Sequence, residues 1–154
     1  MNEGAGRAGQ GRHAAEAGRV EDGEADLAAV AELVARINRH DVGALIEWMT
    51  DDHLFIDSLG RAIRGRESMR GAWEAYFRWF PDYLVVVEQM AFRDGTVLAC
   101  GVAAGTYGAG GPSRPEDAWS APAAWRAVVR DGRIAQWQVY CDNEPARRVL
   151  AAHA

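Results

Sequence analysis

The sequence has few cysteines: two among 154 residues, Cys100 and Cys141, each in a strand-like run and far apart. No metal-ligand spacing is present, and we expect both thiols to be buried and reduced. Serine-nucleophile motifs and the glycine-rich loops that bind phosphate are also missing. An enzyme built from this sequence is therefore expected to work without a metal or a cofactor.

The sequence also lacks an excess of basic residues. Lys and Arg together number 17 against 22 Asp and Glu, which gives a net charge of -5. Phosphate binding needs clustered Lys and Arg, so this balance argues against nucleic acid as a partner. The longest apolar runs are far too short to cross a bilayer, and the N-terminal segment lacks the apolar core of a signal peptide. We expect a cytoplasmic protein that binds neither nucleic acid nor membranes.

What remains is an ordinary globular composition, with 49% hydrophobic and 25% charged residues. A chain of this length suffices for one domain with one core. Residues 1–20 are rich in Gly, Ala and Arg and show no apolar periodicity. This predicts a disordered N-terminal tail before a single domain over residues 21–154.

Apolar spacing predicts three helices in the first half of the chain. One spans Glu24 to His40, a short one follows a cap at Asp41, and the third runs from Gly65 to Pro81. Between the second and third helices, alternation predicts a short strand over His53 to Ser58. A return strand is expected at Arg61 to Arg64.

The second half changes to a strand period. Asp-Gly pairs at 94–95 and 131–132 are hairpin signals, and Gly101 and Gly105 predict bulges or bends. Four long strands follow one another, and a short helix ends the chain: 83–93, 96–108, 117–130, 133–142 and 146–152. Long, bent antiparallel strands curl, so we predict an α+β fold in which a cone-shaped curved sheet wraps around the N-terminal helices.

Five stretches together resemble a known family. They are His40 to Leu45, Asp51 to Gly60, Gly65 to Met69, Phe80 to Tyr83, and Asp131 to Trp137. This combination is similar to the SnoaL-like polyketide cyclase and ketosteroid isomerase branch of the nuclear transport factor 2-like superfamily, over roughly residues 25–150. The resemblance implies the cystatin-like α+β cone and a homodimer formed through the outer face of the sheet.

The first strand carries the candidate catalytic residues. His53, Phe55 and Asp57 share one face of it. Asp57 either caps the turn that follows or is a base whose pKa is raised by desolvation. The resemblance favours the base, because the isomerases have their general base at this position. Tyr76 on the third helix is a further donor. His53 lies ~13 Å along the strand from Asp57, so the two cannot bond directly.

Large rings and small residues alternate on the strands that follow. A pocket inside the cone would suit a small, flat, apolar ligand. The alternative is that the tryptophans fill the cone or cover a dimer face. The lining residues that we expect are Phe55, Trp73, Phe77, Trp119, Trp125, Trp137, Val139 and Cys141.

The sequence departs from the family at the residues that stabilise an enolate. The isomerase donors correspond to Leu33 and to the apolar stretch from Ala121 to Trp125, and the acid of the related epoxide hydrolases corresponds to Val139. Loss of even one such donor removes about 3 kcal/mol of stabilisation. These departures argue against steroid isomerisation by the family's known mechanism and against epoxide hydrolysis. We expect cyclase, isomerase or dehydratase chemistry on an apolar carbonyl or polyketide-like compound by general acid/base catalysis, because each of these reactions begins with proton abstraction. The alternative is a non-catalytic binding or dimeric accessory protein.

Overall fold

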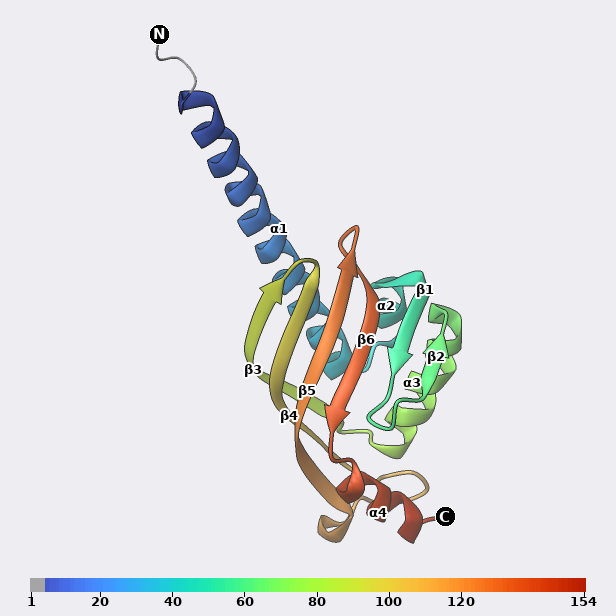
Figure 1. Cartoon of the computed structure of the whole chain (residues 1–154). Helices are drawn as coiled ribbons and strands as arrows, with labels where there is room; N and C mark the ends of the chain where they lie inside the picture. The colour runs from blue at the N-terminus through green and yellow to red at the C-terminus, as the bar shows by residue number, and fades with distance from the viewer. Residues whose placement is uncertain (1–4) are drawn as a thin grey trace.

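The computed structural model describes residues 5–154 as a curved sheet with helices on one side (Figure 1). The helices and strands, in chain order, are α1 (Ala5–Arg39), α2 (Val42–Glu47), β1 (Met49–Ile56), β2 (Ala62–Arg64), α3 (Arg66–Trp79), β3 (Leu84–Arg93), β4 (Thr96–Thr106), β5 (Ala118–Arg130), β6 (Arg133–Cys141) and α4 (Glu144–Ala152). The predicted α+β cone is confirmed.

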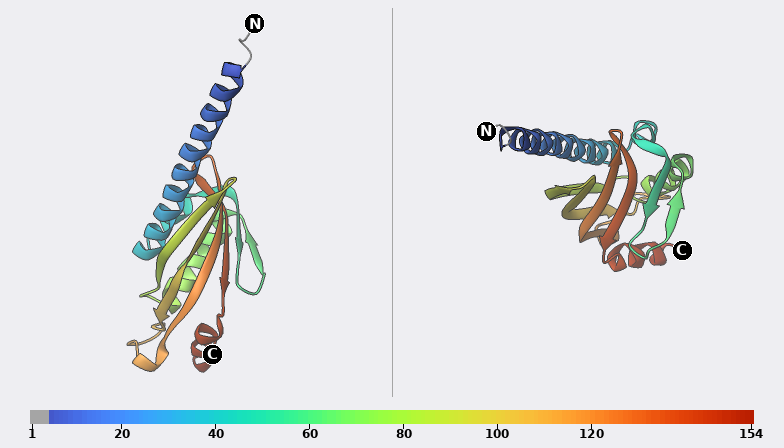
Figure 2. Two further views of the ribbon diagram at one scale, coloured as in Figure 1. Left: turned by 60° about the vertical axis from the view of Figure 1, so that its left-hand side comes forward. Right: turned by 45° about the horizontal axis from the view of Figure 1, so that its top comes forward.

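The six strands form one sheet in the order β2-β1-β6-β5-β4-β3, and its two edges do not meet. Strands β3 to β6 form an antiparallel meander, whereas β1 joins β6 in parallel. Figure 2 shows α1 and α3 on the concave side of the sheet. Both Asp-Gly hairpins are present, and their four residues have the positive φ angles that the prediction requires.

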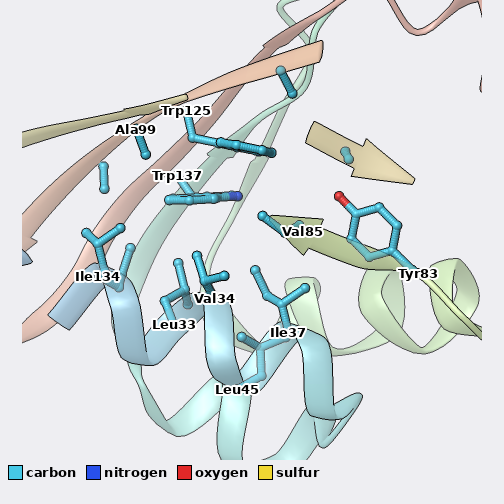
Figure 3. Packing of buried hydrophobic residues seen from close by; sticks show 14 of the residues in the cluster. Leu33, Val34, Ile37, Leu45, Tyr83, Val85, Ala99, Trp125, Ile134 and Trp137 are labelled. Carbon is cyan, nitrogen blue, oxygen red and sulfur yellow. The ribbon is translucent and has the colours of Figure 1, made fainter. Parts of the chain in front are cut away.

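The long strands separate an inner from an outer face. Along β5, Trp119, Ala121, Ala123 and Trp125 are buried, while the residues between them are more exposed. On the opposite side of the core, α1 contributes a buried apolar stripe. Figure 3 shows the α1 side chains Leu33, Val34 and Ile37 facing Trp125 and Trp137 of the sheet. The apolar faces that the helical and strand periods predict therefore pack against each other in a single core.

A β-bulge bends the sheet where β3 pairs with β4. The register shifts between Val87 and Gln89, opposite Gly101 and Cys100. A Cβ atom on Gly101 would lie 1.9 Å from the carbonyl oxygen of Val86, so only glycine fits there. The predicted irregularity at Gly101 is present, with the extra residue on the neighbouring strand.

The start of α1 differs from the prediction. The helix begins at Ala5 rather than Glu24, so residues 5–20, expected to be disordered, are helical in the structure, while residues 1–4 lie outside the described part. Alanine, glutamate and arginine sustain a helix without apolar contacts, which periodicity does not detect. The helix meets the sheet near Gly23, which is buried against the ring of Phe92. Upstream of this contact α1 projects beyond the sheet (Figure 1).

The expectation that both cysteines are buried is wrong for Cys100. Cys100 is exposed and Cys141 is half-buried, and both are free thiols. Cys100 lies between two residues of the inner face, Ala99 and Gly101, so its side chain occupies the outer face of β4. Over the described residues, no helix has the length and apolar character needed to span a membrane.

Candidate ligand-binding site

A cluster of large rings forms the inner floor of the cone. It comprises one residue from α3, one preceding β3, two from β5 and one from β6: Trp73, Tyr83, Trp119, Trp125 and Trp137. Each has at most 9% of its surface exposed. Helical spacing turns Trp73 inward, and the two-residue period does the same for the tryptophans of the strands. We call this set the ring floor.

Tyr83 lies at the centre of the ring contacts. Its ring centroid is 6.4 Å from that of Trp73, 6.1 Å from that of Trp119 and 4.9 Å from that of Tyr76, to which it is perpendicular. Trp125 and Trp137 stack on each other at 6.0 Å. The Tyr76–Tyr83 pair is edge-on and the Trp125–Trp137 pair is stacked, as aromatic pairs prefer, whereas Tyr83 is tilted against Trp73 and Trp119. This packing matches the alternative in which the tryptophans occupy much of the cone.

Half-buried residues form a rim beside this floor. Phe55, Phe77, Val139 and Cys141 are partly exposed and pack against the core, as does Tyr76. Burial raises the pKa of the Cys141 thiol more than its hydrogen bond with Ser58 lowers it. The residues predicted to line a pocket thus divide into a buried floor and a partly open rim.

The ring floor contains two hydrogen-bond donors with no partner. The indole nitrogens of Trp73 and Trp119 are buried and make no hydrogen bond. An indole nitrogen can only donate. Buried donors in native proteins are nearly always paired, so each exception requires an explanation, such as a bound group.

Sequence reasoning did not assign Tyr83 to the site; it placed this residue at the start of a strand and in one of the stretches that resemble the family. In Figure 3 the Tyr83 hydroxyl points toward the sheet residues Trp125 and Trp137. Burial, together with the nearby Cys141 thiol, raises the pKa of Tyr83 well above its ordinary value. The available signal was its position directly after Phe80-Pro81-Asp82, which ends the third helix. A chain that leaves this helix turns back toward the interior of the cone, so the next large residue is a candidate for the site.

The structure places Asp57 in the turn after β1. Its carboxylate accepts hydrogen bonds from the backbone N–H groups of Leu59 and Arg61, both at 2.9 Å, and from the Arg61 side chain at 2.7 Å. Partial burial acts to raise the pKa of Asp57, but these donors outweigh it, and the pKa lies below its ordinary value. Of the two interpretations of Asp57, the one in which desolvation raises its pKa is therefore wrong in this conformation. The turn-capping alternative describes the geometry.

His53 is fully buried, and its Nδ1 lies 2.8 Å from the carbonyl oxygen of Ile134. Nδ1 therefore donates, and Nε2 is left without a proton and without a partner. Desolvation lowers the pKa of His53 despite the hydrogen bond with Ile134. The structure does not bring His53, Asp57 and Tyr76 together through any hydrogen bond among the described residues.

Two hollows on the surface are lined by residues outside the ring floor and its rim. One, of about 420 Å³, lies between α1 and the hairpin ends and is lined by residues that include Asp22, Asp26 and Phe92. The other, of about 500 Å³, is lined by polar residues that include Asp52 and Arg130. Within the described residues, no three His, Cys, Asp or Glu side chains are grouped to hold a metal ion.

A curved sheet that wraps around helices and encloses a ring-lined interior defines the nuclear transport factor 2-like class of α+β proteins. Within this class, the sequence model of the SnoaL-like domain matches residues 30–137. The chain therefore belongs to the SnoaL-like family. A comparison with curated protein sequences gives no match.

Solved structures share this fold. A proposed SnoaL-like polyketide cyclase from Jannaschia sp. CCS1 has a TM-score of 0.71 and 19% identity, with 84% of this chain and 93% of that one covered. A proposed polyketide cyclase from Streptomyces antibioticus has a TM-score of 0.67 and 24% identity, covering 82% and 98%. A protein with a ketosteroid isomerase-like fold from Catenulispora acidiphila has a TM-score of 0.63 and 20% identity, covering 73% and 83%.

Proposed function

We propose that this protein binds a small, flat, apolar carbonyl compound in the cone and rearranges it by general acid/base catalysis without a cofactor. The observation that carries the proposal is the ring floor, an apolar surface that contains two buried N–H groups without partners. Apolar surface favours a flat hydrocarbon frame, and a few fixed polar groups orient it. The partly open rim gives such a compound a route to the floor.

Asp57 is the proposed base. Its lowered pKa keeps it ionised at neutral pH, so its carboxylate is ready to accept a proton. The pair with Arg61 must loosen first, and the Arg61 side chain is largely exposed, which makes that change inexpensive. Tyr76 is the proposed acid, because burial raises its pKa well above the ordinary value and keeps its hydroxyl protonated.

Proton abstraction next to a carbonyl can be measured without knowing the natural substrate. We expect the protein to accelerate exchange of the α-hydrogens of 2-tetralone with D₂O, and Asp57→Asn to remove the acceleration. Asp94→Asn is the matched control, since Asp94 lies in an exposed hairpin turn. Equal exchange rates for wild type and Asp57→Asn would exclude Asp57 as the base.

A second function, ligand binding without chemistry, is favoured by a specific observation. Three donors already hold the Asp57 carboxylate in its turn. For a binding protein we expect 2-tetralone to quench the tryptophan fluorescence while the exchange of its α-hydrogens with D₂O stays at the uncatalysed rate. Undiminished affinity in Asp57→Asn would complete the case for a binding protein.

We also propose that the protein forms a homodimer through the outer face of the sheet. Apolar residues from neighbouring strands meet there: Val86 pairs with Val102, which pairs with Pro122, and Leu84 and Leu98 are exposed on the same face. Tyr140 of β6 extends this set, which we call the outer apolar face. A contiguous apolar surface of this kind is typical of an interaction site, and a second copy presents the matching face.

A further inference from the structure

We propose that the indole N–H groups of Trp73 and Trp119, with the hydroxyl of Tyr83, whose ring adjoins both, are the donors that hold the oxygen atom of the bound compound. The inference rests on the proposed function and deepens it, because it assigns the residues that recognise the oxygen. These three side chains come from α3, from the segment before β3 and from β5, so only the folded chain brings them together.

The two indoles flank Tyr83. The ring centroids of Trp73 and Trp119 lie 6.4 Å and 6.1 Å from that of Tyr83, on the buried floor of the cone. The three side chains are at least nine-tenths buried, and both indole N–H groups lack an acceptor. Three adjoining rings each carry a hydrogen-bond donor, and two of these donors have no partner. Together they form a polar patch inside an apolar interior.

A glycine of β4 faces the buried Trp119 N–H. Gly105 pairs with Trp119 across the sheet, and a Cβ atom on Gly105 would lie 3.5 Å from the Trp119 indole nitrogen. The same Cβ would lie 3.2 Å from Cβ of Phe80. Because the facing residue is glycine, it adds no side chain over this donor.

The patch selects for an acceptor. Indole nitrogens only donate, and a protonated tyrosine hydroxyl donates readily to a carbonyl or enolate oxygen. Burial keeps the Tyr83 hydroxyl protonated. A compound with a carbonyl oxygen therefore gains hydrogen bonds at this patch, while a hydrocarbon of the same shape gains only contact with the rings. The patch is thus a site for recognising oxygen rather than shape alone.

The test compares 9-fluorenone with fluorene, a flat pair that differs by the carbonyl group. We expect wild type to bind 9-fluorenone about tenfold more tightly than fluorene, by tryptophan fluorescence titration, and to shift the ketone stretching band to lower frequency. Tyr83→Phe should remove most of both effects and leave fluorene binding unchanged. Trp73→Phe and Trp119→Phe should act in the same direction. Tyr107→Phe is the control and should resemble wild type, because the Tyr107 ring stacks on His153, outside both the ring floor and the outer apolar face.

The outcomes separate this inference from the proposed function. Equal affinity for the two compounds, or an unshifted ketone band in wild type, would overturn the donor assignment and leave the proposed binding of flat apolar compounds standing. Binding of neither compound would overturn the proposed function itself. Should a tryptophan variant fail to fold, the band position in Tyr83→Phe decides alone, because loss of one hydroxyl preserves the ring packing.

Discussion

At the scale of single residues, the environment of Asp57 decides its chemistry. The strand pattern alone allowed either a cap or a desolvated base. Arg61, four residues further on, supplies both a backbone and a side-chain donor to the carboxylate. Each donor favours the ionised form, so the pKa falls instead of rising. An ionised carboxylate remains a usable base only if Arg61 moves, which makes Arg61 part of any catalytic account.

His53 is the buried titratable residue of β1. Its Nδ1 satisfies the Ile134 carbonyl where the register between β1 and β6 shifts, which is a structural role. Complete burial of the ring disfavours the charged imidazolium, and the pKa of His53 is lowered. His53 therefore stays neutral under conditions in which an exposed histidine is protonated.

This burial predicts a loss of stability in mild acid. Below the ordinary histidine pKa of about 6.5, the unfolded chain binds a proton at His53 that the folded chain does not bind. The free energy of unfolding should therefore fall as the pH is lowered from 7.5 to 5.5, measured by urea denaturation. His53→Gln, which keeps a donor for Ile134, should show a smaller fall. An equal fall in both proteins would show that His53 is not the source of this pH dependence.

At the scale of elements, the bend of the β3–β4 ribbon depends on one glycine. Gly101 faces the bulge on β3, and no side chain fits between it and the Val86 carbonyl. Bulges raise the local twist and curvature of a strand pair. The shape of the cone, and with it the position of the ring floor, therefore depends on this close approach.

Gly101→Ala should destabilise the protein. The added methyl would displace the Val86 backbone, and overpacking of this kind costs about 1–3 kcal/mol. We expect a correspondingly lower urea midpoint. Gly111→Ala is the matched control, because a Cβ at Gly111 meets nothing within 4 Å. Equal urea midpoints for Gly101→Ala and wild type would show that the β3–β4 ribbon accommodates the methyl group without loss of stability.

At the scale of the whole molecule, the sheet has two apolar faces. The inner face is covered by α1 and α3, whereas Leu84, Val86, Leu98 and Tyr140 on the outer face are each more than 40% exposed. Exposed apolar surface of this extent on one side of a sheet is typical of a protein interface. The part of α1 upstream of Gly23 projects away from the sheet and does not cover its outer face (Figure 2).

A charge at the centre of the outer apolar face should separate the two copies. Val86→Glu places a carboxylate opposite its symmetry mate or against apolar side chains, and burying an unpaired charge is strongly unfavourable. Light scattering at micromolar concentration should give a dimer for wild type and a monomer for Val86→Glu. Gly111→Glu adds the same charge in an exposed loop and should remain dimeric. A monomeric wild type would contradict the proposed homodimer.

Much of the fold could be predicted because its signals are local. Helical spacing located the buried stripe of α1, Asp41 caps α2 through the N–H of Ala44 as expected, and Asp-Gly pairs marked both hairpins. The alternation of large and small residues assigned the inner face of β5. The helical segment upstream of Glu24 escaped prediction, because it carries no apolar stripe.

By itself, the sequence determined the elements, their order and which faces are apolar, because these follow from preferences of neighbouring residues. Only the tertiary structure decided which polar groups meet. His53 reaches Ile134 across 81 positions, Tyr83 lies between Trp73 and Trp119, and Cys100 faces outward. Hydrogen-bond partners and desolvation depend on atoms from distant elements, so the pKa values and unpaired donors that define the candidate site exist only once the sheet has curved around its helices.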